Sequence, residues 1–376
     1  MSAFLMRAAA VLAVFVVCLA WSGGHAQAKT RQASCTPTGY MQDNINLTAA
    51  VVITTSGAVA NQTIDATGCN IGVYFAPGSS GVVVNSEIFG ANYYGVLVDA
   101  GNVTVVQSRI HDIHENPFNG TQHGEGVRIE SLHSSRPAFG RIIGNQISAY
   151  QKNGIVVNGP LASAFVMRNA VAGQGPTPII AQNGIEVGRG ARATVTQNTV
   201  QGNSFTGPTN YVATGILVFG GPCFGAPFTT GTTVIGNTAT GNDVGVYLAN
   251  LESDCVSSAA TPTQIMVSQN TLRNDAVTNT SGARLNTPPP NLYPYQAGVT
   301  DVGNRDSIVN NRICGAGYTP PPLPPPFLYT IDITYAISPS VANNTTCSGV
   351  TIMPPQWKAQ KSKAEPPHIS VRVSAG

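Results

Sequence analysis

Residues 153–174 read NGIVVNGPLASAFVMRNAVAGQ and contain the two sequence elements that decide the fold. The first is a glycine followed by alternating apolar residues, GIVV from Gly154. The second is VMRNAV, in which the central Asn169 lies between the apolar Val166 and Val171. Alternation with a period of two is typical of a strand that buries one face. The stretch therefore predicts two short strands joined by turns.

Both elements recur along the chain. Copies of the first start at Gly72, Gly95, Gly126, Gly154, Gly184, Gly215 and Gly245, with steps of 23, 31, 28, 30, 31 and 30 residues, and a weaker copy starts at Gly298. The second recurs between them, centred on Ser86, Ser108, Asn145, Asn169, Asn198, Asn237, Asn270 and Asn311. Self-similarity at such a period indicates a solenoid. We predict an all-β parallel solenoid of about eight coils, with asparagines stacked at one corner and bonded to one another.

The paired patterns G-[IV]-x-[VIL] and N-x-[IVL], over about residues 72–313, resemble the parallel β-helix repeats of the pectate-lyase-like superfamily. The resemblance implies a single-stranded right-handed parallel β-helix, in a secreted or periplasmic protein that acts on polysaccharides. The superfamily also holds repeat proteins without a catalytic role, and a fold does not assign an activity. The sequence lacks the NTD, DD and RIK set of the polygalacturonases and the DPHD of the mannuronan epimerases. A standard pectinase is therefore disfavoured.

The ends of the chain differ from the repeats. Arg7 precedes an apolar run, and Ala26 and Ala28 frame an A-x-A cleavage site, which is the pattern of a signal peptide. Asp301 stands where earlier coils have an apolar residue, so we expect the regular core to end there. The expected organisation is a signal peptide (1–28), an N-terminal cap (29–71), the β-helix (72–318), a Pro-rich connector with a C-terminal cap (319–352) and a disordered tail (353–376).

Six cysteines follow the leader, as expected in an oxidising compartment. Because each neighbouring pair brackets one local segment, we favour the sequential pairing Cys35 with Cys69, Cys223 with Cys255 and Cys314 with Cys347. The net charge of +2 argues against nucleic acid as a partner. No apolar run after the leader is long enough for a membrane span. The expected protein is exported, and its expected partner is a polysaccharide.

If the alternating apolar residues face inward, the residues between them form two outward columns. The first is Tyr74, Leu97, Arg128, Val156, Glu186, Leu217 and Tyr247; the second is Ala76, Asp99, Glu130, Asn158, Gly188, Phe219 and Ala249. The charges gather in the middle coils. The catalytic candidates are Arg128, Glu130, Asp99 and Glu186.

Two chemistries suit these candidates. Cleavage of an acidic glycan by β-elimination needs a cation against the uronate carboxylate, from Arg or from calcium held by carboxylates, and a base. Arg128 with His111, His114 or His123 would supply both, and calcium is a possible cofactor. Hydrolysis needs two carboxylates, for which Asp99 with Glu130 or Glu186 is the candidate pair. Alternatively, Arg128 and Glu130 form a solvated surface ion pair worth less than about 1 kcal/mol.

Further residues are candidates for sugar binding: His114, His123, Asn158, Phe219 and Tyr247, the last two as exposed rings that stack on a sugar. Insertions at residues 117–125 and 252–297 would build the walls of a groove. The H-x-x-H spacing of His111 and His114 is a weak metal motif outside a helix, and we predict no metal site. The leading hypothesis is a secreted protein that binds, and cleaves or modifies, a polysaccharide. The alternative is a non-catalytic surface or envelope scaffold.

Overall fold

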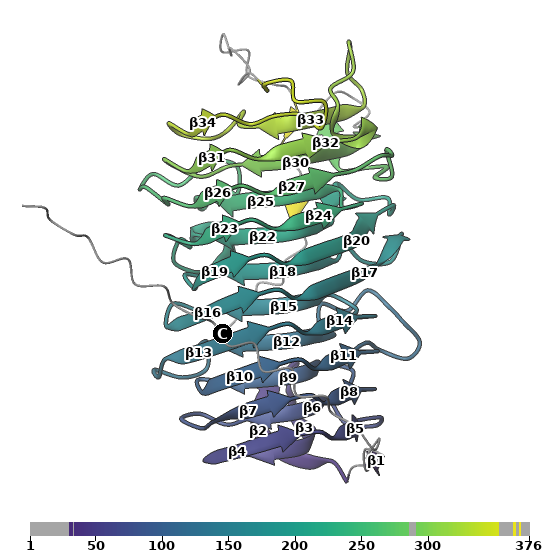
Figure 1. The fold of residues 1–376 in the computed structure, drawn as a ribbon, viewed down its shortest axis with the longest axis vertical. Helices are drawn as coiled ribbons and strands as arrows, with labels where there is room; N and C mark the ends of the chain where they lie inside the picture. The colour runs from purple at the N-terminus through teal and green to yellow at the C-terminus, as the bar shows by residue number, and fades with distance from the viewer. Residues whose placement is uncertain (1–29, 33, 286–290, 353–363, 366–367, 370–376) are drawn as a thin grey trace, which may run out of the picture.

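The computed structural model describes residues 30–32, 34–285, 291–352, 364–365 and 368–369. The predicted signal peptide, residues 1–28, lies outside them. The described chain forms a straight stack of coils in which each full coil gives one strand to each of three long sheets (Figure 1). This arrangement confirms the predicted all-β parallel β-helix.

The central sheet has eleven strands, and all its neighbouring pairs are parallel except β2 with β3. Its strands are β2 (Thr36–Gln42), β3 (Ile45–Ile53), β6 (Ile71–Phe75), β9 (Tyr94–Asp99), β12 (Glu125–Glu130), β15 (Asn153–Asn158), β18 (Asn183–Gly188), β22 (Thr214–Gly220), β25 (Val244–Asn250), β30 (Tyr295–Asp301) and β33 (Phe327–Asp332). The strands that start at the repeated glycines all belong to this sheet.

The other two long sheets have ten strands each. One contains β4 (Ser56–Ala60), β7 (Ser80–Val84), β10 (Asn102–Val106), β13 (Ala138–Ile143), β16 (Ala162–Met167), β19 (Arg192–Thr196), β23 (Thr233–Ile235), β26 (Met266–Ser268), β31 (Ser307–Val309) and β34 (Ser340–Ala342). The other contains β1 (Thr30–Gln32), β5 (Thr63–Asp65), β8 (Glu87–Phe89), β11 (Arg109–His111), β14 (Gln146–Ser148), β17 (Ala170–Thr177), β20 (Thr199–Phe205), β24 (Thr238–Thr240), β27 (Thr271–Arg273) and β32 (Arg312–Cys314). Outside them lie β21 (Tyr211–Val212), β28 (Ala283–Leu285), β29 (Asn291–Tyr293), β35 (Ala364–Glu365), β36 (His368–Ile369) and the 3-10 turns η1 (Pro222–Phe224) and η2 (Ala316–Tyr318).

The repeated glycine is required by the distance between coils. A Cβ on Gly95, Gly126 or Gly154 would lie 2.5–2.6 Å from the carbonyl oxygen of the equivalent glycine on the next coil. Real Cβ atoms do not approach so closely, and the neighbour is backbone that cannot move aside. The glycine column is therefore a steric requirement of stacking.

The corner residues form the predicted ladder. The backbone N–H of Asn169 donates to Oδ1 of Asn198 at 2.9 Å, and Nδ2 of Asn169 donates to the same oxygen. The next step repeats these bonds between Asn198 and Asn237, and the ladder continues through Asn311 to Asn344. Each amide also donates to a carbonyl of the preceding coil, as Asn198 does to Val166. The buried corner is thus fully hydrogen-bonded.

The solenoid is longer at both ends than predicted. Strands β3, β4 and β5 pair in parallel with β6, β7 and β8, so residues 45–65 form a coil that we had assigned to the cap. At the far end, β33 pairs with β30 and β34 pairs with β31, so residues that we had assigned to the C-terminal cap extend two of the long sheets. Neither β3 nor β33 carries the glycine that marks the other coils. That is why the repeat pattern did not reveal them.

The core does not end at Asp301, as we had expected. Asp301 is buried beside Asp306, and Ile331 of β33 continues the apolar column beyond Val299 of β30. Of the predicted disordered tail, four residues are described, and they are strands. Strand β35 pairs with β28 and β36 pairs with β21.

The three predicted disulfides are confirmed: Cys35 with Cys69, Cys223 with Cys255 and Cys314 with Cys347. The first ties the segment before β2 to the turn before β6, and the third joins the end of β32 to the loop after β34. The second lies among the loops beside β22 and β25.

Candidate functional site

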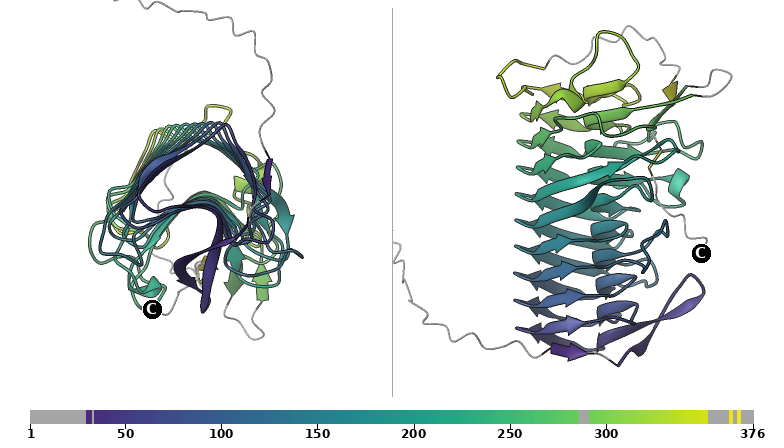
Figure 2. Two further views of the ribbon diagram at one scale, coloured as in Figure 1. Left: turned by 90° about the horizontal axis from the view of Figure 1, so that it is seen from below. Right: turned by 90° about the vertical axis from the view of Figure 1, so that its right-hand side faces the viewer.

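The outer face of the central sheet is covered at its N-terminal end by a hairpin. Strands β2 and β3 are joined by Asp43 and Asn44, both with positive φ (52° and 62°), as a two-residue type I′ turn requires. Figure 2 shows this purple hairpin leaving the first coil and standing beside the stack. The ring of Tyr40 packs edge-on against Tyr74 and Tyr94, each with centroids 6.3 Å away. The first coils therefore have no free outer face here.

The same face is covered at its C-terminal end by apolar side chains. Phe219 and Tyr247 belong to a buried cluster with Phe224 of η1 and with Ala283 and Tyr295 from the 252–297 insertion. The rings of Phe219 and Phe224 meet edge-on at 5.0 Å. The prediction that Phe219 and Tyr247 are exposed rings is therefore wrong, because loops from later coils bury them.

Between the two covers lies a pocket of about 490 Å³. Its floor is the outer face of β12, β15 and β18, and it is lined by Tyr40, Met41, Gln42, Asp43, Asn44, Tyr94, Gln122, Glu125, Arg128, Leu132, His133, Lys152, Asn153, Asn158, Glu186 and Arg189. Pockets of roughly 300–1,000 Å³ are the usual size for small ligands.

The observed register agrees with the predicted outward columns. Arg128 pairs with Val156 and Val156 with Glu186, while Glu130 pairs with Asn158. A third column, which we did not predict, precedes the repeated glycines. Asn153 Nδ2 donates to Glu125, and Asn183 Nδ2 donates to Asn153, at 3.1 and 3.0 Å. These amides fix the carboxylate of Glu125 beside Arg128.

Arg128 holds two buried carboxylates. Its Nη1 donates to both oxygens of Glu125 at 3.0 and 3.1 Å, and its Nε donates to Glu130. The side chain of Arg128 is 12% exposed and that of Glu130 is 0% exposed. The alternative prediction, that Arg128 and Glu130 form a solvated surface ion pair, is therefore wrong. Removal of this guanidinium would leave two buried charges without a counter-ion.

Glu130 is fixed by three partners. Besides Arg128, it accepts hydrogen bonds from the hydroxyl of Tyr40 at 2.7 Å and from Nδ1 of His133 at 2.8 Å. Burial opposes ionisation of Glu130, but Arg128, His133 and Tyr40 outweigh it and lower its pKa to about 2. The same contact raises the pKa of His133. Glu130 is therefore a permanent anion with a positioning role.

Asp99 is buried beneath the N-terminal cover and does not line the pocket. One oxygen accepts a hydrogen bond from the hydroxyl of Tyr74 at 3.1 Å. Burial and the nearby Glu130 raise the pKa of Asp99 to about 6. The predicted hydrolytic pairing of Asp99 with Glu130 or Glu186 is not present in the pocket.

Lys152 and Glu186 are two titratable groups of the pocket whose pKa values are shifted in opposite directions. Burial lowers the pKa of Lys152, against the attraction of Glu186 and Glu125. Burial, with repulsion from Glu125, raises the pKa of Glu186. Lys152 Nζ donates to the carbonyl of Ala181 at 2.6 Å. Both groups are thereby shifted toward their neutral forms, which suits proton transfer near neutral pH.

Two more side chains line the pocket at the carboxyl ends of the strands. Asn158 is buried, and its Oδ1 accepts no hydrogen bond from any described residue. Such an acceptor carries a desolvation cost that a ligand hydroxyl would remove. Arg189 is also buried. Its burial, and to a smaller extent repulsion from Arg128, lower its pKa.

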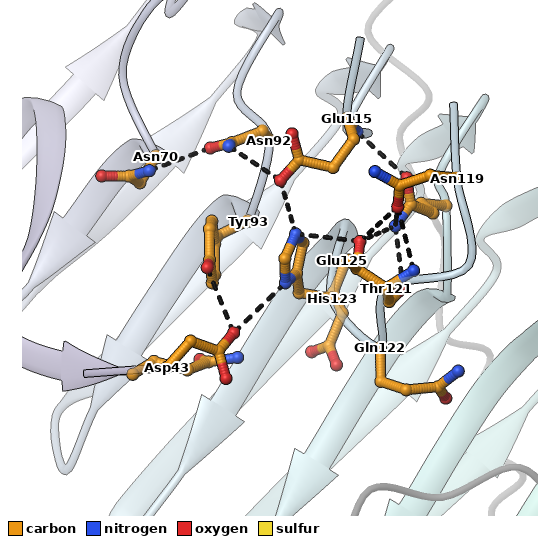
Figure 3. A network of polar contacts seen from close by, with 12 residues as sticks. Asp43, Asn70, Asn92, Tyr93, Glu115, Asn119, Thr121, Gln122, His123 and Glu125 are labelled. Atoms are coloured by element: carbon orange, nitrogen blue, oxygen red, sulfur yellow. Dashed lines mark hydrogen bonds and ion pairs between the residues drawn. The ribbon is translucent and has the colours of Figure 1, made fainter. Parts of the chain in front are cut away.

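Neither predicted histidine lines the pocket. His123 is buried and stacks on Tyr93 with centroids 3.8 Å apart, and its ring nitrogens lie 2.6 Å from Glu115 and 3.5 Å from Asp43 (Figure 3). It joins the tip of the hairpin to the 117–125 insertion. His114 bonds through Nδ1 to the carbonyl of Glu115 and packs against Phe118. His123 is therefore part of the wall, and His114 lies outside the site.

Sequence reasoning missed Tyr40, Glu125, His133, Lys152 and Arg189. Tyr40 comes from a segment that we assigned to a cap, and Lys152 directly precedes strand β15. A usable signal existed for Glu125, because polar residues precede the repeated glycine in four successive coils: Glu125, Asn153, Asn183 and Thr214. Two of these coils carry the outward charges Arg128, Glu130 and Glu186.

Within the described residues, no group of three or more His, Cys, Asp or Glu side chains is arranged to hold a metal ion. The described ranges likewise contain no helix with the length and hydropathy of a membrane span. None of the curated proteins matches this sequence. Residues 49–255, more than half of the chain, match the family described as "Right handed beta helix region". With its parallel sheets, glycine column and asparagine ladder, this chain belongs to the right-handed β-helix family.

Proposed function

We propose that this protein is a secreted enzyme that binds an acidic polysaccharide in the pocket and cleaves it by proton transfer through Lys152 and Glu186. The observation that carries the proposal is a buried lysine and a buried glutamate in one pocket with opposed pKa shifts. Strongly perturbed groups in a cleft are typical of functional sites. The leader sequence and three disulfides support export.

The substrate class follows from the charges of the lining. Two guanidinium groups, those of Arg128 and Arg189, line the pocket together with the amine of Lys152. Arg189 directly follows β18 and lines the pocket together with Arg128, so a guanidinium group would face a sugar carboxylate there. The amide of Asn158 would accept a hydrogen bond from a sugar hydroxyl.

The reaction that fits these groups is β-elimination. The neutral amine of Lys152 removes the proton from the carbon next to the sugar carboxylate and becomes an ammonium. The released electron pair forms a carbon–carbon double bond as the bond to the glycosidic oxygen breaks. Glu186 protonates that oxygen and becomes a carboxylate. Transfer of one proton from Lys152 to Glu186 then restores both groups for the next turnover.

Hydrolysis is the competing chemistry, and it needs a pair of carboxylates. Glu130 is held as an anion by three partners, and Asp99 lies outside the lining. Glu186 with Glu125 is the pair that the pocket offers for hydrolysis. Elimination yields unsaturated ends that absorb ultraviolet light, whereas hydrolysis yields reducing ends without that absorbance.

The test is to incubate the mature protein with polygalacturonate, alginate and glycosaminoglycans, with and without calcium, and to follow absorbance and reducing ends together. Unsaturated ends from an acidic polymer are the expected result. Reducing ends without absorbance would replace elimination by hydrolysis. If no polymer yields new ends and none binds, the non-catalytic scaffold is the correct function.

A further inference from the structure

We infer that the pocket receives the end of a polysaccharide chain and not an internal segment of it; this inference rests on the proposed function and deepens it. A site that binds internal segments must let the chain leave at two sides. This pocket is bounded by side chains in the plane of the sheet and opens away from its floor.

The N-terminal side is closed by the β2–β3 hairpin. Tyr40 is buried and reaches Glu130 on the floor through its hydroxyl. Gln42 accepts a hydrogen bond from the hydroxyl of Tyr94. These contacts connect both the strand and the tip of the hairpin to the sheet, so a chain cannot pass between hairpin and floor.

The side at the start of the strands is closed by the 117–125 insertion, which contributes Gln122 to the lining. Its His123 and the hairpin's Asp43 meet at 3.5 Å, and Tyr93 donates to the same carboxylate at 3.1 Å (Figure 3). Glu115 holds the other ring nitrogen of His123 at 2.6 Å. Two walls are thereby joined at one corner.

The C-terminal side is closed by an aromatic ring that lies over a glycine. A Cβ on Gly188 would lie 2.5 Å from Cζ and 2.7 Å from Cδ1 of Phe219. The ring therefore fills the place where a side chain of β18 would stand. Phe224 packs edge-on against that ring, and Leu217, which pairs with Glu186, is fully buried. The sugar path along the sheet ends at Glu186.

The open floor is short as a result. It spans β12, β15 and β18, and adjacent parallel strands lie about 4.8 Å apart, so its first and last strands are about 10 Å apart. At the carboxyl ends of these strands, Leu132, His133 and Arg189 bound the fourth side. The pocket therefore has room for a few sugar residues that enter from outside the sheet.

The test is a binding stoichiometry that does not require turnover. The mature protein, kept inactive by Lys152→Met, is titrated calorimetrically with saturated oligogalacturonates and oligomannuronates of increasing length and with the polymers. End recognition predicts one protein bound per chain at every length, with an affinity per chain that levels off at a short oligomer. Stoichiometry that rises with chain length would overturn the inference while leaving the proposed function intact.

Two variants open the walls. Met41 is 53% exposed at the hairpin tip and lines the pocket. The substitution Met41→Ala therefore shortens the wall of the pocket without removing a side chain from the hydrophobic core. Phe219→Ala opens the C-terminal side, with a loss of stability that Met41→Ala avoids. Each should raise the number of proteins bound per polymer chain, and Phe165→Ala, an exposed ring on another sheet, should not.

Active wild-type protein gives the matching kinetic result. An end-acting enzyme releases short products while the viscosity of the polymer solution falls slowly. The variants Met41→Ala and Phe219→Ala should lower this viscosity more for each new chain end that they produce. A rapid fall in viscosity with wild type, with a ladder of intermediate sizes, would overturn end recognition alone. Absence of binding by every oligomer and polymer would overturn the proposed function together with this inference.

Discussion

Two columns of buried polar side chains run through this molecule, and they differ in how they are satisfied. In the corner ladder, one residue type recurs from coil to coil, and each amide bonds to the next coil. On the outer face of the central sheet, Arg128, Val156 and Glu186 occupy one column, and every coil differs. The ladder is closed by its own hydrogen bonds, whereas the face keeps Asn158 Oδ1 without one. In a repeat protein, regular polar positions build the stack, and irregular ones identify the site.

The largest effect is expected at Lys152, the proposed base on the outer face of the central sheet. Lys152→Met keeps much of the length of the side chain and removes the amine. We expect cleavage to fall by roughly 10²–10⁴-fold, as for loss of a general base, with little change in thermal unfolding. Arg168→Gln, at an exposed corner, is the control and should keep full activity. Full activity of Lys152→Met would remove the proposed base.

Arg128 is predicted to stabilise the fold more than a surface arginine does, because it carries a charge inside the site. Arg128→Met leaves Glu125 and Glu130 buried without their counter-ion, and we expect a loss of about 3–5 kcal/mol in the free energy of unfolding. Arg109→Met removes an ion pair with Glu87 in which the Arg109 side chain is 57% exposed, and should cost less than about 1 kcal/mol. Chemical denaturation of both variants measures the difference. Equal costs would show that the site pair is solvated after all.

The contact between Arg128 and Glu130 also makes the stability of the fold depend on pH. The pKa of Glu130 is lowered to about 2 from its ordinary 4.5, so its ionised form stabilises the fold above pH 4.5. That stabilisation is lost as pH falls toward 2, because unfolding then lets the carboxylate take up a proton. Glu130→Gln should flatten this acid limb in a series of thermal melts. A limb as steep as that of wild type would mean that other carboxylates dominate acid unfolding.

The ladder itself predicts an effect on stability alone. Asn198→Ala removes bonds to Asn169, Asn237 and the carbonyl of Val166. We expect about 1–3 kcal/mol lost for each buried group left unpaired, and unchanged kcat below the lowered Tm. Gln201→Ala, exposed on β20, is the matched control. A loss of kcat without a change of Tm would contradict the division between ladder and site.

The smallest effect is expected at Asp301. Burial and the neighbouring Asp306 raise the pKa of Asp301 well above its ordinary 3.8. A raised carboxyl pKa stabilises the fold at low pH, and this contribution is lost as pH rises through the native value. Asp301→Asn stays neutral and can bond to Asp306, so its unfolding temperature should depend less on pH and should not fall at pH 7. Asp275→Asn, on an exposed loop, should change neither.

The fold was largely predictable because its requirements repeat. A glycine at each close approach of two coils and an asparagine or serine at each corner leave a signal in eight places, whereas the coils at β3 and β33 lack that glycine and were missed. The floor of the site was partly predictable, since alternation placed Arg128, Asn158 and Glu186 on the outer face. Its walls were not, because burial of Phe219 and the position of Tyr40 depend on segments distant in sequence.

The disulfides have a consequence for how the rod resists unravelling. Their partners are 34, 32 and 33 residues apart, about the length of one coil, and the first and third lie at opposite ends of the stack. A linear array in which each repeat contacts only its neighbours loses order most readily from its ends. Here both ends are covalently clamped, and β12, β15 and β18 lie near the middle of the row. Reduction should therefore let proteases trim the ends first, while the coils that carry the pocket are the last to be reached.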